Sequence, residues 1–308
     1  MRDAIAPERF LPSQPMQSTT ATTHPPQPFG RRVRNALPAT SLLLPVALFL
    51  LGCFVVPLAQ LLGLSLTGTG GPLSSYAAIA GTAVYREVFV NTIVLAFNVA
   101  VFSVLLAYPT AYMLTKLQGS ALALAFWCVL FPLWISVLVR NFAWILLLGQ
   151  NGPVNQLLVG MGLVDSPRQF LFNSTGVYVG MVHVLLPYAL LPIYSAMKGI
   201  DARLLQASEG LGARPLQTFV RVYAPLSMPG VAAGFLLVFL MALGFFITPA
   251  LLGGIKNVTI SMLVDTFVQE QLVWPMAAAA AFWMLALVLV LVGLAARFVN
   301  ITDTVAAR

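Results

Sequence analysis

The side chains that most often perform nucleophilic or acid–base chemistry are few in this sequence and far apart. It contains two histidines, His24 and His183, and two cysteines, Cys53 and Cys128, and both cysteines lie inside apolar runs. Such cysteines cannot build a disulfide scaffold or a four-ligand zinc site, so we interpret them as small buried hydrophobic residues. His183 also falls within an apolar run, and we expect a packed, hydrogen-bonded histidine there.

The acidic residues form no pair suited to general acid–base catalysis. Glu87, Asp165, Asp265 and Glu270 are spread over three separate connections between apolar runs, and this spacing supports no paired-carboxylate site. The sequence has no G-x-x-x-x-G-K-[ST] phosphate loop and no H-E-x-x-H zinc motif. We therefore expect a protein that is not an enzyme, with no catalytic residue, no metal site and no cofactor of its own.

The composition is that of an integral membrane protein. Of 308 residues, 59% are hydrophobic and only 8% are charged, with a mean hydropathy of +0.92. Soluble domains carry about 25% charged residues, so this chain has too few charges to solvate a globular surface. Its net charge of +7 is scattered between the apolar runs, which argues against nucleic-acid binding.

Six stretches reach the length of about 20 apolar residues that a transmembrane helix needs. They predict an all-α, polytopic membrane protein with spans at about 41–66, 88–115, 121–148, 176–197, 229–252 and 277–298. Two spans open with glycines four residues apart, Gly176 with Gly180 and Gly230 with Gly234. This spacing favours close helix packing within the chain.

The distribution of lysine and arginine predicts the orientation. If the N-terminus is cytoplasmic, twelve of the sixteen basic residues lie on the cytoplasmic side, as the positive-inside rule requires. Both termini are then cytoplasmic. We divide the chain into a disordered cytoplasmic tail at 1–38, a six-span domain at 39–300 and a cytoplasmic C-terminal tail at 301–308.

The predicted spans contain almost no ionisable residue apart from Arg140, near the outer end of the third stretch. Carriers driven by protons or sodium usually need charged groups at mid-membrane. We therefore expect the energy for transport to come from elsewhere. For Arg140 we expect a structural role, such as bonding to carbonyls at the outer helix ends.

The most informative segment is the long cytoplasmic connection at 198–228. Asp201 is a plausible N-cap of a first short amphipathic helix, and Gly212 fits the position just after that helix. A second short helix is predicted to start near Pro215 and to end at Pro225. From the residues alone, such helices either rest on lipid headgroups or insert into a groove of a partner protein.

This segment resembles the cytoplasmic signature of binding-protein-dependent ABC-transporter permeases, which reads Glu-Ala-Ala, three residues, Gly, and later a hydrophobic-Pro element. Gln206, Ala207 and Ser208 occupy the Glu-Ala-Ala positions, Gly212 is the glycine and Pro225 the proline. Gln206 lacks the charge of the usual glutamate, and Glu209, three residues on, is a possible replacement. Ser208 replaces a small residue with another small one.

Two further segments, 138–144 and 242–254, resemble the spermidine/putrescine branch of these permeases, of the first-permease type. The resemblance covers roughly residues 40–300. It implies a type I importer in the bacterial inner membrane, in which this chain pairs with a second homologous permease to form the path for a polyamine. A periplasmic substrate-binding protein would deliver the solute, and two cytoplasmic ATPase subunits would bind the ATP and Mg²⁺.

The resemblance also suggests roles for individual residues. Leu211, Leu216 and Phe219 are candidates for the buried contact with the ATPase. Aromatic faces attract organic cations, so Tyr108, Trp144, Tyr188 and Phe245 are candidates to line the path. The alternative function is an ion-coupled or passive transporter or channel that works without an ATPase.

Overall fold

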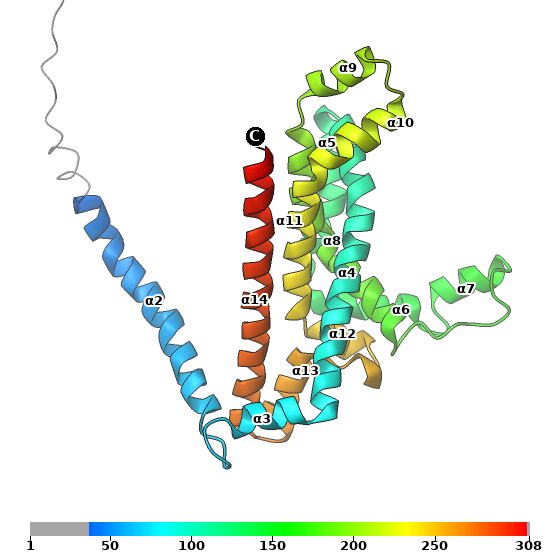
Figure 1. Cartoon of the computed structure of the whole chain (residues 1–308). Coiled ribbons are helices and arrows are strands. Elements are labelled where there is room, and N and C mark those ends of the chain that lie inside the picture. The colour runs from blue at the N-terminus through cyan, green and yellow to red at the C-terminus, as the bar shows by residue number, and fades with distance from the viewer. Residues whose placement is uncertain (1–36, 307–308) are drawn as a thin grey trace, which may run out of the picture. The chain divides into compact units, whose positions relative to one another are not determined.

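The structure, a computed structural model, describes residues 37–306, and side chains over 44–294. Within residues 37–306 the regular elements are helices and no strand occurs (Figure 1). This confirms the all-α prediction. Of the predicted tail at 1–38, residues 1–36 lie outside the described residues.

Helices of very different length alternate along the chain. α2 (Leu37–Ser65) is one apolar helix and contains Pro45 and Pro57. The elements that follow are α3 (Ser74–Gly81), α4 (Ala83–Lys116), α5 (Gly119–Leu130), η1 (Phe131–Trp134), α6 (Val137–Leu148), α7 (Pro153–Gly160), α8 (Ser174–Lys198), α9 (Ala202–Gly210), α10 (Pro215–Thr218), η2 (Phe219–Tyr223), α11 (Ala224–Leu243), α12 (Ile247–Leu252), η3 (Ile255–Asn257), α13 (Ile260–Asp265), η4 (Thr266–Glu270) and α14 (Trp274–Ala306).

Five helices in the described part are long and apolar enough to cross a membrane, and a bent pair of helices adds a sixth span if it counts as one. The five are α2, α4, α8, the continuous helix from α10 through α11, and α14. The six predicted stretches correspond to these five helices and the bent pair. α14 continues to Ala306, so most of the segment predicted as a C-terminal tail is helical.

The third predicted span, 121–148, is not one helix. The segments 119–134 and 137–160 meet at 99°. Pro132 has no backbone N–H, the surrounding turn is a 3₁₀ turn, and Ile135 and Ser136 are extended, so the α-helical hydrogen bonds stop there. The guanidinium of Arg140 donates to the carbonyls of Pro132 and, at 2.7 Å, of Ile135. The predicted carbonyl-bonding role of Arg140 is confirmed, and its place is this bend.

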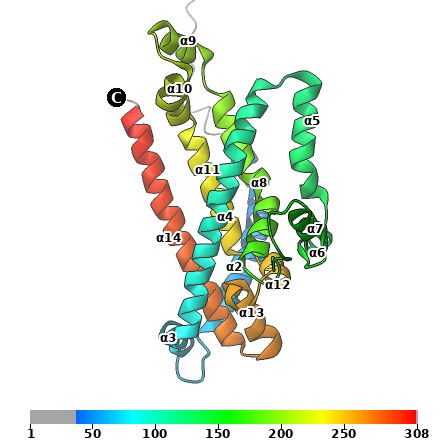
Figure 2. The same cartoon turned by 90° about the vertical axis from the view of Figure 1, so that its right-hand side faces the viewer.

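The centre of the bundle is formed by α4, α8 and α11, which make the most extensive helix–helix contacts (Figure 2). α4 faces the other two helices with small buried residues, Ala96, Ala100, Ala107 and Ala111. Small residues let backbones approach closely, which is how helices in membranes gain packing energy.

The predicted glycine contacts are made within the chain. A Cβ added at Gly234 would lie 2.8 Å from the carbonyl oxygen of Ala189, and one at Gly230 would lie 2.8 Å from that of Pro192. The backbones of α8 and α11 therefore touch at these two positions. A Cβ added at Gly180 would lie 2.7 Å from Cγ2 of Thr248, at the start of α12.

The bundle has two distinct ends (Figures 1 and 2). The connection between α8 and α11, with α9 and α10, lies at one end, which we call the loop end. The starts of α4 and α8, together with α3, α12, η3 and α13, lie at the other, which we call the pocket end. A second hydrophobic cluster, centred on the buried Phe267, joins α3, α13 and α14 there.

Candidate functional site

The connection at the loop end folds as two short helices around a tight turn. The carboxylate of Asp201 accepts a hydrogen bond from the backbone N–H of Arg203 at 2.9 Å, which confirms it as the N-cap of α9. Gly212 has a φ of +84°, a conformation that costs a residue with a Cβ roughly 1–2 kcal/mol. Pro215 opens α10 as predicted.

The prediction that the second helix ends at Pro225 is wrong. The chain runs as one helix from Pro215 to Leu243. Residues 219–223 form a π-turn, in which the N–H of Ala224 bonds to the carbonyl of Phe219, five residues back. This wider turn directly precedes Pro225 and lets the helix continue past a residue that normally interrupts it.

A hydrogen bond between side chains holds the two helices of the connection together. The hydroxyls of Ser208, on α9, and Thr218, at the end of α10, are 2.8 Å apart, and Ser208 also donates to the carbonyl of Leu205. Thr218 is buried. The family signature has alanine at position 208, whereas in this chain the serine at that position joins α9 to α10 by a hydrogen bond.

Apolar side chains on the same connection point to solvent. Leu211 is 90% exposed and Leu216 is 73% exposed, and Leu204 and Val220 are also exposed. We call these four residues the loop patch. Gln206, Ala207 and Glu209 are exposed on α9 beside it. Several exposed apolar residues on one short segment are typical of a surface that binds a partner or a membrane.

Phe219, predicted to contact the ATPase, is half-buried against aromatic rings of its own chain, and its contact with the ATPase stays a prediction. Its ring is stacked on that of Tyr223 and meets the rings of Tyr108 and Tyr112 of α4 edge to face, with centroids 5.6–6.3 Å apart. We call these four residues the aromatic cluster. Tyr108, predicted for the path, also shares a hydrogen bond with Ser227 of α11. The cluster thus fastens the π-turn to α4.

The other predicted path residues lie elsewhere in the bundle. The indole N–H of Trp144 donates to Nδ1 of His183 at 3.3 Å, so His183 is the hydrogen-bonded histidine that we expected. Tyr188 and Phe245 are half-buried and pack against the central core. The assignment of all four to a path stays a prediction.

The two outlying segments that resemble the permease family touch each other. The hydroxyl of Thr248 donates to the side-chain oxygen of Asn141 at 3.0 Å, and both residues are buried. This bond joins α6, just after the bend, to α12. Neither residue stood out by itself in the sequence, because the bond connects positions 107 residues apart.

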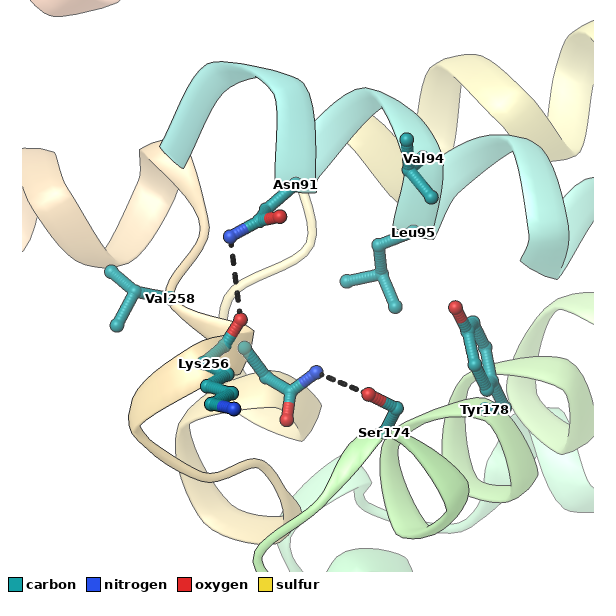
Figure 3. A pocket seen from close by; sticks show the side chains of 8 residues that line it. Asn91, Val94, Leu95, Ser174, Tyr178, Lys256 and Val258 are labelled. Atoms are coloured by element: carbon teal, nitrogen blue, oxygen red, sulfur yellow. Dashed lines mark hydrogen bonds between the residues drawn. The ribbon is translucent and has the colours of Figure 1, made fainter. Parts of the chain in front are cut away.

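The pocket end contains a polar cavity of about 140 Å³ between α4, α8 and η3 (Figure 3). Its lining includes Asn91, Ser174, Tyr178 and Asn257. Asn257 donates to Ser174 at 2.9 Å, and Asn91 makes a long bond of 3.4 Å to the carbonyl of Lys256. The feature of the sequence that could have indicated this site is Asn91, an asparagine in an apolar helix.

The arrangement of the helices is that of a membrane subunit of an ABC importer. The structure of a bacterial alginate ABC transporter, solved in complex with an alginate pentasaccharide-bound periplasmic protein, contains a chain that superposes with a TM-score of 0.70. The match covers 87% of this chain and 96% of that one at 17% sequence identity. This likeness establishes the fold.

The family follows from the sequence matches. The profile of the family described as "Binding-protein-dependent transport system inner membrane component" matches residues 70–300, and this chain belongs to that family. It is 33% identical over 231 residues to the spermidine/putrescine transport system permease protein PotB of Salmonella typhimurium, covering 74% of this chain and 80% of that protein. PotB of Escherichia coli is 35% identical over 197 residues, which cover 64% and 72% of the two chains.

Proposed function

We propose that this chain is a permease subunit of an ATP-driven importer for polyamines such as spermidine and putrescine. The observation that carries the proposal is the 33% identity to a spermidine/putrescine permease over 80% of that protein's length, together with membership of the binding-protein-dependent family. A periplasmic protein would deliver the solute, and this chain would form the path with a second, homologous permease.

The loop patch is the proposed docking surface for a cytoplasmic ATPase. Leu211 and Leu216 would enter its groove, as exposed apolar residues of a short helical segment do. Gln206 and Glu209 lie beside them for polar contacts. The ATP and Mg²⁺ would bind to the ATPase, since this sequence has no phosphate loop. The loop end and both termini would then be cytoplasmic, in agreement with the excess of basic residues there.

Co-purification tests the docking surface. The chain is expressed with its ATPase, second permease and binding protein, and wild type is compared with Leu211→Asp and Leu216→Asp. A buried carboxylate without a partner costs several kcal/mol, so we expect the ATPase to be lost while the second permease is retained. The matched control is Leu163→Asp, which changes an exposed leucine in the connection between α7 and α8, a segment that lies away from α9 and α10 (Figure 1).

Transport measurements then test the substrate. Proteoliposomes that contain the wild-type complex are expected to import radiolabelled spermidine or putrescine only with the binding protein outside and ATP inside. Retention of the ATPase by both loop variants would contradict the docking proposal. Polyamine import without any ATPase would instead establish the ion-coupled or passive transporter.

A further inference from the structure

One side of α4 carries two asparagines in an otherwise strongly apolar helix. Asn91 and Asn98 are seven residues apart, so they lie nearly one above the other on the same face. Phe102 follows four residues after Asn98 on that face and is exposed. We call Asn91, Asn98 and their neighbour Tyr178, on α8, the polar stripe.

The hydrogen bonds of the polar stripe leave acceptor atoms available. The Asn98 amide donates to the Tyr178 hydroxyl oxygen at 3.0 Å, and the Tyr178 ring meets Phe102 edge to face, with centroids 5.8 Å apart. Within the described residues, the side-chain oxygens of Asn91 and Asn98 accept no hydrogen bond. Both asparagines and Tyr178 are partly accessible. The stripe is therefore open to a hydrogen-bond donor.

Lipid is an unsuitable neighbour for this surface. A polar group without a partner in hydrocarbon costs several kcal/mol, whereas a water-filled path or a solute satisfies it. The polar cavity at the pocket end continues into the stripe, because Asn91 and Tyr178 belong to both (Figure 3). Through the Tyr178 hydroxyl, which lines the cavity and accepts from Asn98, the polar stripe extends from the pocket end to a residue inside the span.

The stripe has the chemistry that binds protonated amines. Amide and hydroxyl oxygens accept N–H donors, and the faces of Tyr178 and Phe102 attract a cation by about 0.5–2 kcal/mol. The cation that lines the cavity, Lys256, lies on the opposite side from Tyr178 (Figure 3).

We propose that Asn98 and Tyr178, with Asn91 and Phe102 on either side, form a binding station for protonated amines in the transport path. This inference rests on the proposed function and adds to it the residues that recognise the solute inside the membrane. It differs from the sequence prediction, which placed Tyr108, Trp144, Tyr188 and Phe245 in that role.

Substitutions that change the charge or the hydrogen bonding of residue 98 test the binding station. The reconstituted complex is supplied with saturating spermidine-loaded binding protein, and spermidine import and ATP hydrolysis are both measured. We expect Asn98→Lys and Asn98→Leu to reduce import at least tenfold, together with the ATP hydrolysis that spermidine-loaded binding protein stimulates, while the complex still assembles. Asn98→Asp is expected to retain import, because a carboxylate also accepts hydrogen bonds from the N–H groups of a protonated amine.

The controls separate recognition from packing. Leu289→Asn places an amide at a 62% exposed position on another helix, α14, and we expect normal import. Asn98→Ala removes the amide without adding bulk and replaces Asn98→Leu if leucine prevents assembly. Failure of both variants to assemble would assign Asn98 to helix packing and overturn the proposal, as would equal losses with lysine and aspartate.

The proposed function and this inference fail in different ways. Polyamine import by wild type together with normal import by Asn98→Lys and Asn98→Leu overturns the binding station alone. A wild-type complex that holds its ATPase and binding protein but imports neither spermidine nor putrescine overturns the polyamine function, and the station with it.

Discussion

At the scale of single residues, a few hydrogen bonds between distant segments position the backbone irregularities of this permease. Arg140 donates hydrogen bonds to the carbonyls of Pro132 and Ile135 at the bend before α6. Directly after it, Asn141 accepts from Thr248 of α12. Because Gly180 of α8 packs against that threonine, three separate segments meet at one buried bond.

This bond gives the first prediction. Thr248→Val keeps the shape of the side chain but leaves the buried oxygen of Asn141 without its donor, which costs about 1–3 kcal/mol. We expect a lower midpoint of thermal unfolding for the purified complex. Thr110→Val is the control, because its hydroxyl bonds only to the carbonyl of Leu106 in the same helix. Equal midpoints for the two variants would mean that the Asn141–Thr248 bond contributes nothing to stability.

Residue-level features that depend on near neighbours were predictable from the sequence. The cap at Asp201 and the left-handed turn at Gly212 follow from residue type and from a few positions on either side. The pairing of Asn98 with Tyr178 spans 80 residues and depends on how α4 and α8 meet. The sequence alone does not indicate which residues of α4 and α8 meet, so the polar stripe could be identified only from the structure.

At the scale of elements, apolar length predicted which segments are helical but not where they bend. Pro132 and Pro225 look alike in the sequence, as prolines in or beside an apolar run. One adjoins a 99° bend, while the other lies in a helix that continues. A π-turn precedes Pro225, and the aromatic cluster fastens this turn to α4.

The contact between α8 and α11 gives the second prediction. Gly234→Ala would place a methyl group 2.8 Å from the backbone oxygen of Ala189, so the helices must separate. Overpacking of this kind costs about 1–3 kcal/mol, and we expect a lower unfolding midpoint and slower import. The matched control is Gly293→Ala in α14, where no atom lies within 4 Å of the new Cβ. A midpoint for Gly234→Ala as high as that of the control would contradict the close contact.

At the scale of the whole molecule, the two ends of the bundle differ in chemistry. The loop end exposes apolar leucines on short helices, as expected of a surface that a partner covers, while the pocket end has a polar cavity. In an importer the solute enters at one end and ATP-driven motion is applied at the other. The direction of transport therefore depends on which end faces the cytoplasm.

Cysteine labelling tests this orientation. In a variant with Cys53 and Cys128 replaced by alanine, a single cysteine is introduced at Leu211, at the loop end, or at Ile255, at the pocket end. The two positions are matched, since Leu211 is 90% and Ile255 is 96% exposed. The positive-inside rule predicts that a membrane-impermeant maleimide labels Ile255→Cys in intact spheroplasts and Leu211→Cys only after permeabilisation. Labelling of both in detergent shows that each thiol is reactive, and the reverse pattern in spheroplasts would place the loop patch outside, where no ATPase could reach it.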